Sequence, residues 1–441
     1  MALARKKEII GLLVCALILG TITLCFFPLS HSYLNKKAAE LIQKKGALDS
    51  CSVEKVSLTL SRGLLIHDLL CIKKIGKKKS IRIEIPITRI DYRALKTFRN
   101  WGKIQSSLKP AGNKRAKRKL INTKYLLNYL YTVILKPDTL LYSCINMIVF
   151  ERGDVTIDSM GYRIAGIEKM RGTIHVAKEA PSSLKIKVSA DEAYGALVLV
   201  SKPKVTMKLD GPHCVMKKFS GNSFGGKLDA ELDLNLLYNR INSAHITLKK
   251  ADLEKIYSAM KDNEGILDGK CTVELNIDTS TTEFATLKAA GSVTLSKVSA
   301  SHIPLVTNIA LLLNIEKLSH LTFRKISGDY AVEEGRVLVD SLDGEGDPLS
   351  LSLNGWVKPE TGHFSFKVNG IFESYYEDSM SGLAWNTLVP EEDGRRSFIC
   401  TVYGTPDNPT VSLDRELMQR AVKNVFQDIK NDLKSIFRKR K

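Results

Sequence analysis

Hydrophobic and polar residues alternate along much of the chain after residue 50. In Ile81–Ile87 and Leu228–Leu236, every second side chain is Ile, Leu or Ala. Successive side chains of a strand point to opposite faces of a sheet, so each run predicts a strand with one apolar and one polar face. The same alternation recurs in Leu184–Val188, Val205–Leu209, Val273–Ile277, Leu349–Leu353 and Phe364–Val368.

Short turn segments separate these predicted strands. Candidate turns are Arg152-Gly153-Asp154, Asp210-Gly211-Pro212, Gly225-Gly226, a hairpin centred on Glu334-Gly335, and Gly344–Pro348. Parallel strands need long crossover connections, whereas connections this short suit antiparallel neighbours. The pattern therefore predicts a mainly β chain built as one long antiparallel sheet with a few helices.

Four segments carry helical patterns. They are Ser32–Lys44, about Thr123–Leu135, Ile303–Leu318, and an amphipathic tail at Asp414–Phe437 that ends in Arg438–Lys441. These helices are too few to cover a one-sided sheet. Its apolar face must then pack on a second sheet, as in a sandwich, or curl into a groove that holds an apolar ligand. The alternation suits both arrangements.

The positive charge of the chain is confined to its first part. Residues 1–130 hold 27 Lys and Arg against seven Asp and Glu, and the remaining residues hold 39 against 40. Ile9–Phe27 is a stretch of 19 uncharged, mostly apolar residues, which predicts a transmembrane anchor rather than a cleaved signal peptide. Arg5, Lys6 and Lys7 precede it and favour a cytoplasmic N-terminus. Basic loops beside a membrane attract anionic headgroups, at about 1 kcal/mol for each Lys or Arg.

Motifs for catalysis or metal binding are weak. Gly221–Gly225 matches the GxSxG pattern, but that chemistry needs a helix after Ser223, and the pattern here predicts a strand. The eight cysteines form no CxxC pair, and the histidines form no HxH or HExxH pair. We expect no catalytic residue, metal or cofactor, and no nucleic-acid binding, because aromatic residues are not interleaved with the basic clusters. Pairing among the cysteines outside the anchor stays open.

Several segments resemble the AsmA-like family in their order along the chain. Val53–Leu69 and Ile85–Tyr92 follow the anchor and a short helix, like that family's opening strands. Near the other end come Gly291–Leu295, an apolar helix from Ile303, Gly328-Asp329-Tyr330 and Glu334–Val337. Leu353–Trp356 and Gly404–Val411 complete the match, which covers about half of the chain. Residues 100–180 depart from the family pattern.

The resemblance implies a curled β-groove with a chorein-like start, anchored in the inner membrane of a diderm bacterium with most of the chain in the periplasm. It also implies phospholipid transport between the inner and outer membranes, with other envelope proteins as candidate partners. A non-enzymatic scaffold for assembly of outer-membrane proteins or polysaccharide is the alternative, and a hydrolase using Ser223 is a remote third.

The groove hypothesis gives two sets of candidate functional residues. The candidates that line the groove are Ile81, Ile83, Ile85, Ile87, Leu228, Leu232, Leu234, Val273, Leu275, Leu351, Leu353, Phe364, Phe366 and Val368. The candidates that contact anionic headgroups are Lys73, Lys74, Lys77, Lys78, Lys79, Lys114 and Arg115.

The chain divides into five predicted parts. The first two are the anchor (1–30) and the helix with a basic chorein-like β region (31–120). A middle β-groove region with a helical insertion follows (121–290). The last two are the AsmA-like β region with its apolar helix at 303–318 (291–413), and the tail helix (414–441).

Overall fold

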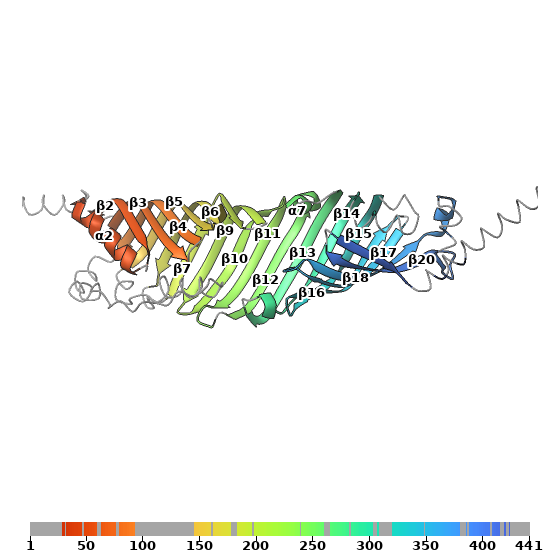
Figure 1. Cartoon of the computed structure of the whole chain (residues 1–441). Helices are drawn as coiled ribbons and strands as arrows, with labels where there is room; N and C mark the ends of the chain where they lie inside the picture. Colours follow the sequence, from red (N-terminus) through yellow and green to blue (C-terminus); the bar gives the residue numbers. More distant parts are fainter. Residues whose placement is uncertain are drawn as a thin grey trace, which may run out of the picture. The chain divides into compact units, whose positions relative to one another are not determined.

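The structure is a computed structural model. It describes residues 29–30, 32–45, 48–59, 63–75, 79–92, 145–159, 162–177, 183–195, 198–238, 240–259, 265–281, 284–302, 320–347, 349–379, 388–405 and 408–414, with residues 307, 385, 419 and 423. Within these residues, 21 strands join in one sheet (Figure 1). Every pairing discussed below is antiparallel, so the mainly β, antiparallel prediction is confirmed.

The chain forms two compact units, which are described separately. Unit 1 comprises Met1–Gly221 and Glu231–Arg240, and unit 2 comprises Asn222–Ala230 and Ile241–Lys441. Strands β10 (His213–Ser223), β11 (Gly226–Asn235) and β12 (Arg240–Asp252) contain the boundary.

Unit 1 begins with one helix beside a series of hairpins. Its other elements are β1 (Leu29–Ser30), α2 (Ser32–Lys45), β2 (Ser50–Thr59), β3 (Gly63–Ile75), β4 (Lys79–Tyr92), β5 (Ile145–Ser159), β6 (Tyr162–Val176), β7 (Ser183–Ser189), β8 (Glu192–Gly195) and β9 (Val198–Asp210). From β2 to β6, each strand pairs with the next one in sequence. β6 and β9 each pair with both β7 and β8.

Helix α2 protects the edge of β2. The Asn35 side chain donates from Nδ2 to the carbonyl oxygen of Glu54 (2.7 Å) and accepts the Val56 amide at Oδ1 (2.7 Å). Its carboxamide therefore satisfies backbone groups that a neighbouring strand would otherwise bind. An exposed strand edge is a template for pairing with another chain, and α2 closes this part of it. The helix predicted at Ser32–Lys44 is confirmed, with Lys45 as its last residue.

Unit 2 consists mainly of longer hairpins. Its elements are α7 (Leu253–Ala259), β13 (Ile266–Thr281), the 3₁₀ turn η2 (Phe284–Thr286), β14 (Ala289–Ser301), β15 (His320–Glu333), β16 (Arg336–Gly346), β17 (Leu349–Lys358), β18 (His363–Phe372), the 3₁₀ turn η4 (Ser374–Ser379), β19 (Val389–Pro390), β20 (Arg396–Thr405) and β21 (Asn408–Leu413). Each strand from β13 to β18 pairs with the next, then β18 pairs with β20, and β20 with β21.

The predicted turns had mixed outcomes. Glu334 and Gly335 both have positive φ (50° and 70°) and close the β15–β16 hairpin, as predicted. Gly211 likewise lies in the turn between β9 and β10. The turn predicted at Arg152-Gly153-Asp154 was wrong, because these residues lie inside β5. Arg152 has φ 55°, and the pairing of β5 with β6 shifts beside it, so the segment is a β-bulge.

In six cross-strand pairs among the described strands, an aromatic ring covers the glycine directly opposite it. The cross-strand pairs are Phe150–Gly172, Tyr194–Gly166, Tyr330–Gly291, Phe323–Gly346, Phe366–Gly355 and Phe398–Gly370. A Cβ atom at each of these glycines would overlap the ring it faces. Each ring thus covers the backbone of its glycine, an arrangement that lets a sheet bend without leaving a gap.

We predict that Gly370→Ala destabilises unit 2 by about 1–3 kcal/mol, because the new methyl group overlaps the Phe398 ring, which is only 1% exposed. Denaturant titration followed by tryptophan fluorescence measures the change, since Trp385 lies in the same cluster. Lys367→Ala on the exposed side of β18 is the control and should shift stability by less than about 0.5 kcal/mol. Equal effects of the two substitutions would contradict the prediction.

Candidate functional site

The register of unit 2 places apolar residues in rows that cross its strands. One such row runs from β13 through β21 and contains no charged residue: Val273, Val293, Gly328, Leu342, Leu353, Val368, Cys400 and Leu413. The adjacent rows begin with Cys271–Leu295–Ile326 and with Leu275–Gly291–Tyr330, and they are equally free of charge. We call these three rows the apolar face of unit 2. Its eight strands give it a width of about 34 Å at a spacing of about 4.8 Å.

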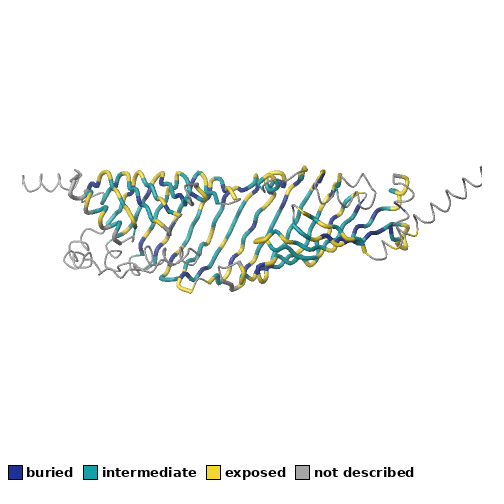
Figure 2. Tube along the Cα trace, in the orientation of Figure 1, coloured by how far each residue is buried: buried dark blue, intermediate teal, exposed yellow. Residues whose placement is uncertain are grey.

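Exposure varies along this face (Figure 2). Val273, Val293 and Leu342 are only half-buried. The Tyr330 ring lies over Gly291, and its hydroxyl donates to the carbonyl oxygen of Glu274 (2.9 Å), so its polar atom is satisfied at the edge of the face. Burial raises the pKa of this hydroxyl. The β13–β16 part therefore offers partly accessible hydrocarbon surface.

Protein covers the other end of the face. Trp385 and Leu388 pack with Phe372 and Phe398 in a cluster whose members are at most 4% exposed. Tyr376 of η4 stacks on Phe372, with ring centroids 5.8 Å apart. Arg396 holds this cover, because its guanidinium lies 5.6 Å from the centre of the Trp385 ring and donates to the carbonyl oxygen of Leu388.

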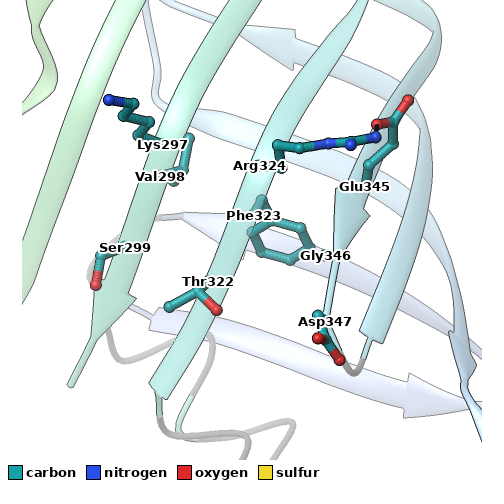
Figure 3. Close-up of a pocket in the computed structure, with 9 residues that line it drawn as sticks. All are labelled: Lys297, Val298, Ser299, Thr322, Phe323, Arg324, Glu345, Gly346 and Asp347. Atoms are coloured by element: carbon teal, nitrogen blue, oxygen red, sulfur yellow. Dashed lines mark hydrogen bonds and ion pairs between the residues drawn. The ribbon is translucent and has the colours of Figure 1, made fainter.

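A hollow of about 530 Å³ lies beside Phe323 on β15 (Figure 3). Phe323 faces Gly346 of β16, and Arg324 reaches the Glu345 carboxylate at 2.5 Å. The guanidinium holds the pKa of Glu345 below its usual range. Lys297, Ser299, Thr322 and Asp347 complete the polar part of the lining. The hollow thus combines apolar and charged groups at one border of the apolar face.

The opposite side of the same strands is polar. A row on that side contains Thr272, Thr294, Ser327, Asp343 and Ser352. Hydrogen bonds from the hydroxyls of Ser341 (2.6 Å) and Ser352 (2.7 Å) lower the pKa of Asp343. The two faces therefore differ in chemistry as the alternation of the sequence predicted.

In unit 1, apolar rows cross the strands in the same way. One row contains Cys51, Cys71, Ile83, Val155, Ile167, Ala193 and Val200, and another contains Val56, Ile66, Thr88, Phe150, Gly172, Val188 and Val205. A line of irregular backbone separates these two rows. Asp68 (φ 48°) and Arg152 (φ 55°) lie on it in the left-handed conformation.

This irregularity corrects one groove candidate. Ile81 is buried, and Ile83 and Ile85 are half-buried, but Ile87 is 38% exposed and pairs with His67 and Glu151 on the polar side. After Pro86 the buried positions are Thr88 and, partly, Ile90. The prediction that alternation continues unchanged through Pro86 was therefore wrong. Before Pro86 the odd-numbered side chains lie on the buried side, and after it the even-numbered ones do.

The remaining groove candidates fall into two groups. Leu228, Leu232, Val273, Leu275 and Phe366 are half-buried, and Val273 packs against the buried cluster of Ala251, Leu253, Cys271, Val298 and Phe323. Leu234 is buried, Val368 belongs to the Trp385 cluster, and Leu351, Leu353 and Phe364 pack against that cluster. Leu351, Leu353, Phe364 and Val273 are thus half-buried side chains that contact buried clusters of the protein.

The basic candidates are only partly described. Lys73 and Lys74 lie in β3, where the Lys73 ammonium is 4.0 Å from Asp49 and the Lys74 amide donates to the same carboxylate. Lys79 begins β4 and is exposed. Lys77, Lys78, Lys114 and Arg115 lie outside the described residues, as do the predicted helix at 123–135, nearly all of the predicted apolar and tail helices, and the anchor Ile9–Phe27. No described helix is long and apolar enough to cross a membrane.

The described part of the chain does not bring together the residues needed for a GxSxG nucleophile or for a metal site. Ser223 ends β10, and the turn at Phe224-Gly225 leads directly into β11, so the GxSxG segment is a hairpin rather than a strand–turn–helix elbow. Ser223 is 3% exposed. The described residues contain no group of three or more His, Cys, Asp or Glu side chains that could hold a metal ion.

The glycine–aromatic pairs and the Cys51–Cys71 pair were not predicted from the sequence. Glycine inside an alternating strand is a signal of close backbone approach, and Gly291, Gly355 and Gly370 carry it. Which ring each glycine faces depends on the register between two paired strands, and the sequence around the glycine alone does not determine that register.

Comparison with known proteins gives no match. No protein-family model matches the chain, and no curated protein or solved structure matches it.

The reversal of faces at Pro86 predicts that substitutions at Ile85 and Ile87 differ in their effect on stability. Ile85→Lys places an ammonium group on the apolar side and should lower stability by about 1–3 kcal/mol. Ile87→Lys should change it by less than about 0.5 kcal/mol, because Glu151 lies opposite and can pair with the new charge. Protease resistance as a function of denaturant concentration measures both variants. Equal losses would show that Ile87 also faces the apolar side.

Proposed function

We propose that the chain is a membrane-anchored lipid-transport protein that carries phospholipid acyl chains along the apolar face of its sheet. Ile9–Phe27 would anchor it in the inner membrane of a diderm bacterium, with the bulk of the chain in the periplasm. Its role would be lipid homeostasis of the outer membrane. The observation that carries this proposal is the charge-free, half-buried apolar face of unit 2 over β13–β16.

The dimensions of the face support an acyl ligand. A bilayer core of about 30 Å holds two opposed tails, so one tail spans about 15 Å, less than half the width of the face. Each methylene removed from water contributes about 0.8 kcal/mol. Neighbouring rows are similar in chemistry and offer no strong stopping point, so a tail could slide while its headgroup stays in water. Transfer would need no bond making.

Charge near the anchor supports contact with a membrane surface. Lys74 and Lys79 are exposed at the β3–β4 connection, within the basic first part of the chain. Anionic headgroups would attract such side chains. The order of segments that resembles AsmA-like proteins is consistent with the same function. Other envelope proteins could extend the path toward the outer membrane.

An assembly scaffold without lipid is the second candidate. The cover formed by Tyr376, Trp385 and Leu388 favours it, because it shows that part of the apolar face is closed by protein. If the chain is a scaffold, protein would cover the β13–β16 part of the face in the same manner.

Photo-crosslinking in living cells distinguishes the two candidates. A photoreactive amino acid at position 293 on the apolar face should yield an adduct of phospholipid mass with the full chain. The same amino acid at position 294, one residue along β14 on the polar side, is the matched control. Lipid labelling at both positions, or protein adducts alone at position 293, would favour the scaffold.

We also predict that Val293→Glu reduces phospholipid transfer between vesicles at least about tenfold, because a carboxylate on the apolar face must be desolvated when a tail passes. Thr294→Glu should leave transfer unchanged. Thermal unfolding of both variants is measured in parallel. Loss of the fold in Val293→Glu alone would mean that the position is covered by protein and would support the scaffold.

A further inference from the structure

Two cysteines face each other across the first hairpin of unit 1. Cys51 on β2 is the direct cross-strand partner of Cys71 on β3, and their Sγ atoms are 3.5 Å apart. Both are free thiols. Directly opposite residues in an antiparallel pair have Cα atoms about 4.5–5.5 Å apart, within the range of about 4.4–6.8 Å found in disulfides. The backbone is therefore already placed for a bond between them.

The other described cysteines lack this arrangement where the register is known. Cys271 faces Leu295, and Cys400 faces Val368 and Leu413. Burial raises the pKa of both thiols, that of Cys400 to about 11. Their surroundings are those of small buried apolar side chains.

The two thiols of the pair are not equivalent. Cys51 is half-buried, whereas Cys71 is 4% exposed. The hydrogen bond between the two thiols lowers the pKa of Cys51, and the same interaction together with burial raises that of Cys71. The thiolate is the nucleophile in disulfide exchange, so an external disulfide meets Cys51 first.

We propose that Cys51 and Cys71 are a modification site that forms a cross-strand disulfide by exchange with a small disulfide such as oxidised glutathione. The Cys51 thiolate attacks one glutathione sulfur, which breaks the glutathione disulfide and releases one glutathione thiolate. The Cys71 thiolate then attacks Cys51 Sγ and releases the second glutathione. Two electrons pass from the protein thiols to glutathione, and the two protons that the cysteines lose go to the released thiolates.

The bond has a clear structural consequence. It joins residues 20 positions apart and ties β2 to β3 on the side opposite α2. β2 would then be held on one edge by Asn35 and on the other by a covalent bond. The strand next to the N-terminal segment could no longer peel away from the sheet.

The test uses the full chain in detergent, treated with oxidised glutathione, alkylated with N-ethylmaleimide and analysed by peptide mass spectrometry. Wild type should give one species in which the Cys51 and Cys71 peptides are linked. Cys71→Ser should stop at glutathione bound to Cys51, and Cys51→Ser should leave Cys71 as a thiol. Cys400→Ser is the control and should form the linked species as wild type does.

Two results would overturn the proposal. One is full alkylation of both cysteines in the wild type, and the other is wild type that stops at the Cys51–glutathione adduct. Alanine variants at both positions repeat the test if a serine variant misfolds, because alanine introduces no polar group on the apolar side. In the linked species β2 should also separate from the sheet less readily. We expect proteolysis N-terminal to residue 63 to be slower in this species than in the same protein after reduction with dithiothreitol.

Discussion

The cross-strand register of the sheet determines every other property described above. Side chains alternate between two faces, so a slip of β14 by one residue against its neighbours would carry Val293 and the other apolar side chains of that strand to the polar side. The glycine–aromatic pairs resist such a shift. In the wrong register, a ring such as Phe398 would meet a side chain in place of Gly370.

The apolar face of unit 2 must be shielded from water, and its two ends meet this requirement differently. Near β18–β20, residues of the connecting segment cover it, and Trp385 and Leu388 are almost fully buried. Over β13–β16 most side chains of the face are half-buried, and Cys271 is buried. Hydrocarbon surface in water is unfavourable by roughly 25 cal/mol per Å². A ligand with an apolar chain would relieve this cost without permanent closure, which is why the partly open rows matter more to the proposed function than the cluster around Trp385.

Local sequence patterns predicted the features that depend on neighbouring residues. Period-two alternation identified strands, the Glu334-Gly335 pair identified a hairpin, and the Ser32 segment identified a helix. Features that depend on the register between strands were missed. The exposure of Ile87 follows from a backbone irregularity shared with Asp68 and Arg152, and the pairing of Cys51 with Cys71 follows from register. The chemistry of the apolar face was foreseen in part, but the cover over Leu351 and Phe364 was not.

The succession of hairpins in unit 2 also affects how the protein is made. From β13 to β18, each strand pairs with the one synthesised just before it, so most contacts can form as the chain emerges. Trp385 and Leu388 follow all six of these strands in the sequence. The hydrocarbon surface is therefore complete before its own cover exists, and nascent chains must pass through a stage in which a chaperone or lipid can occupy that surface first.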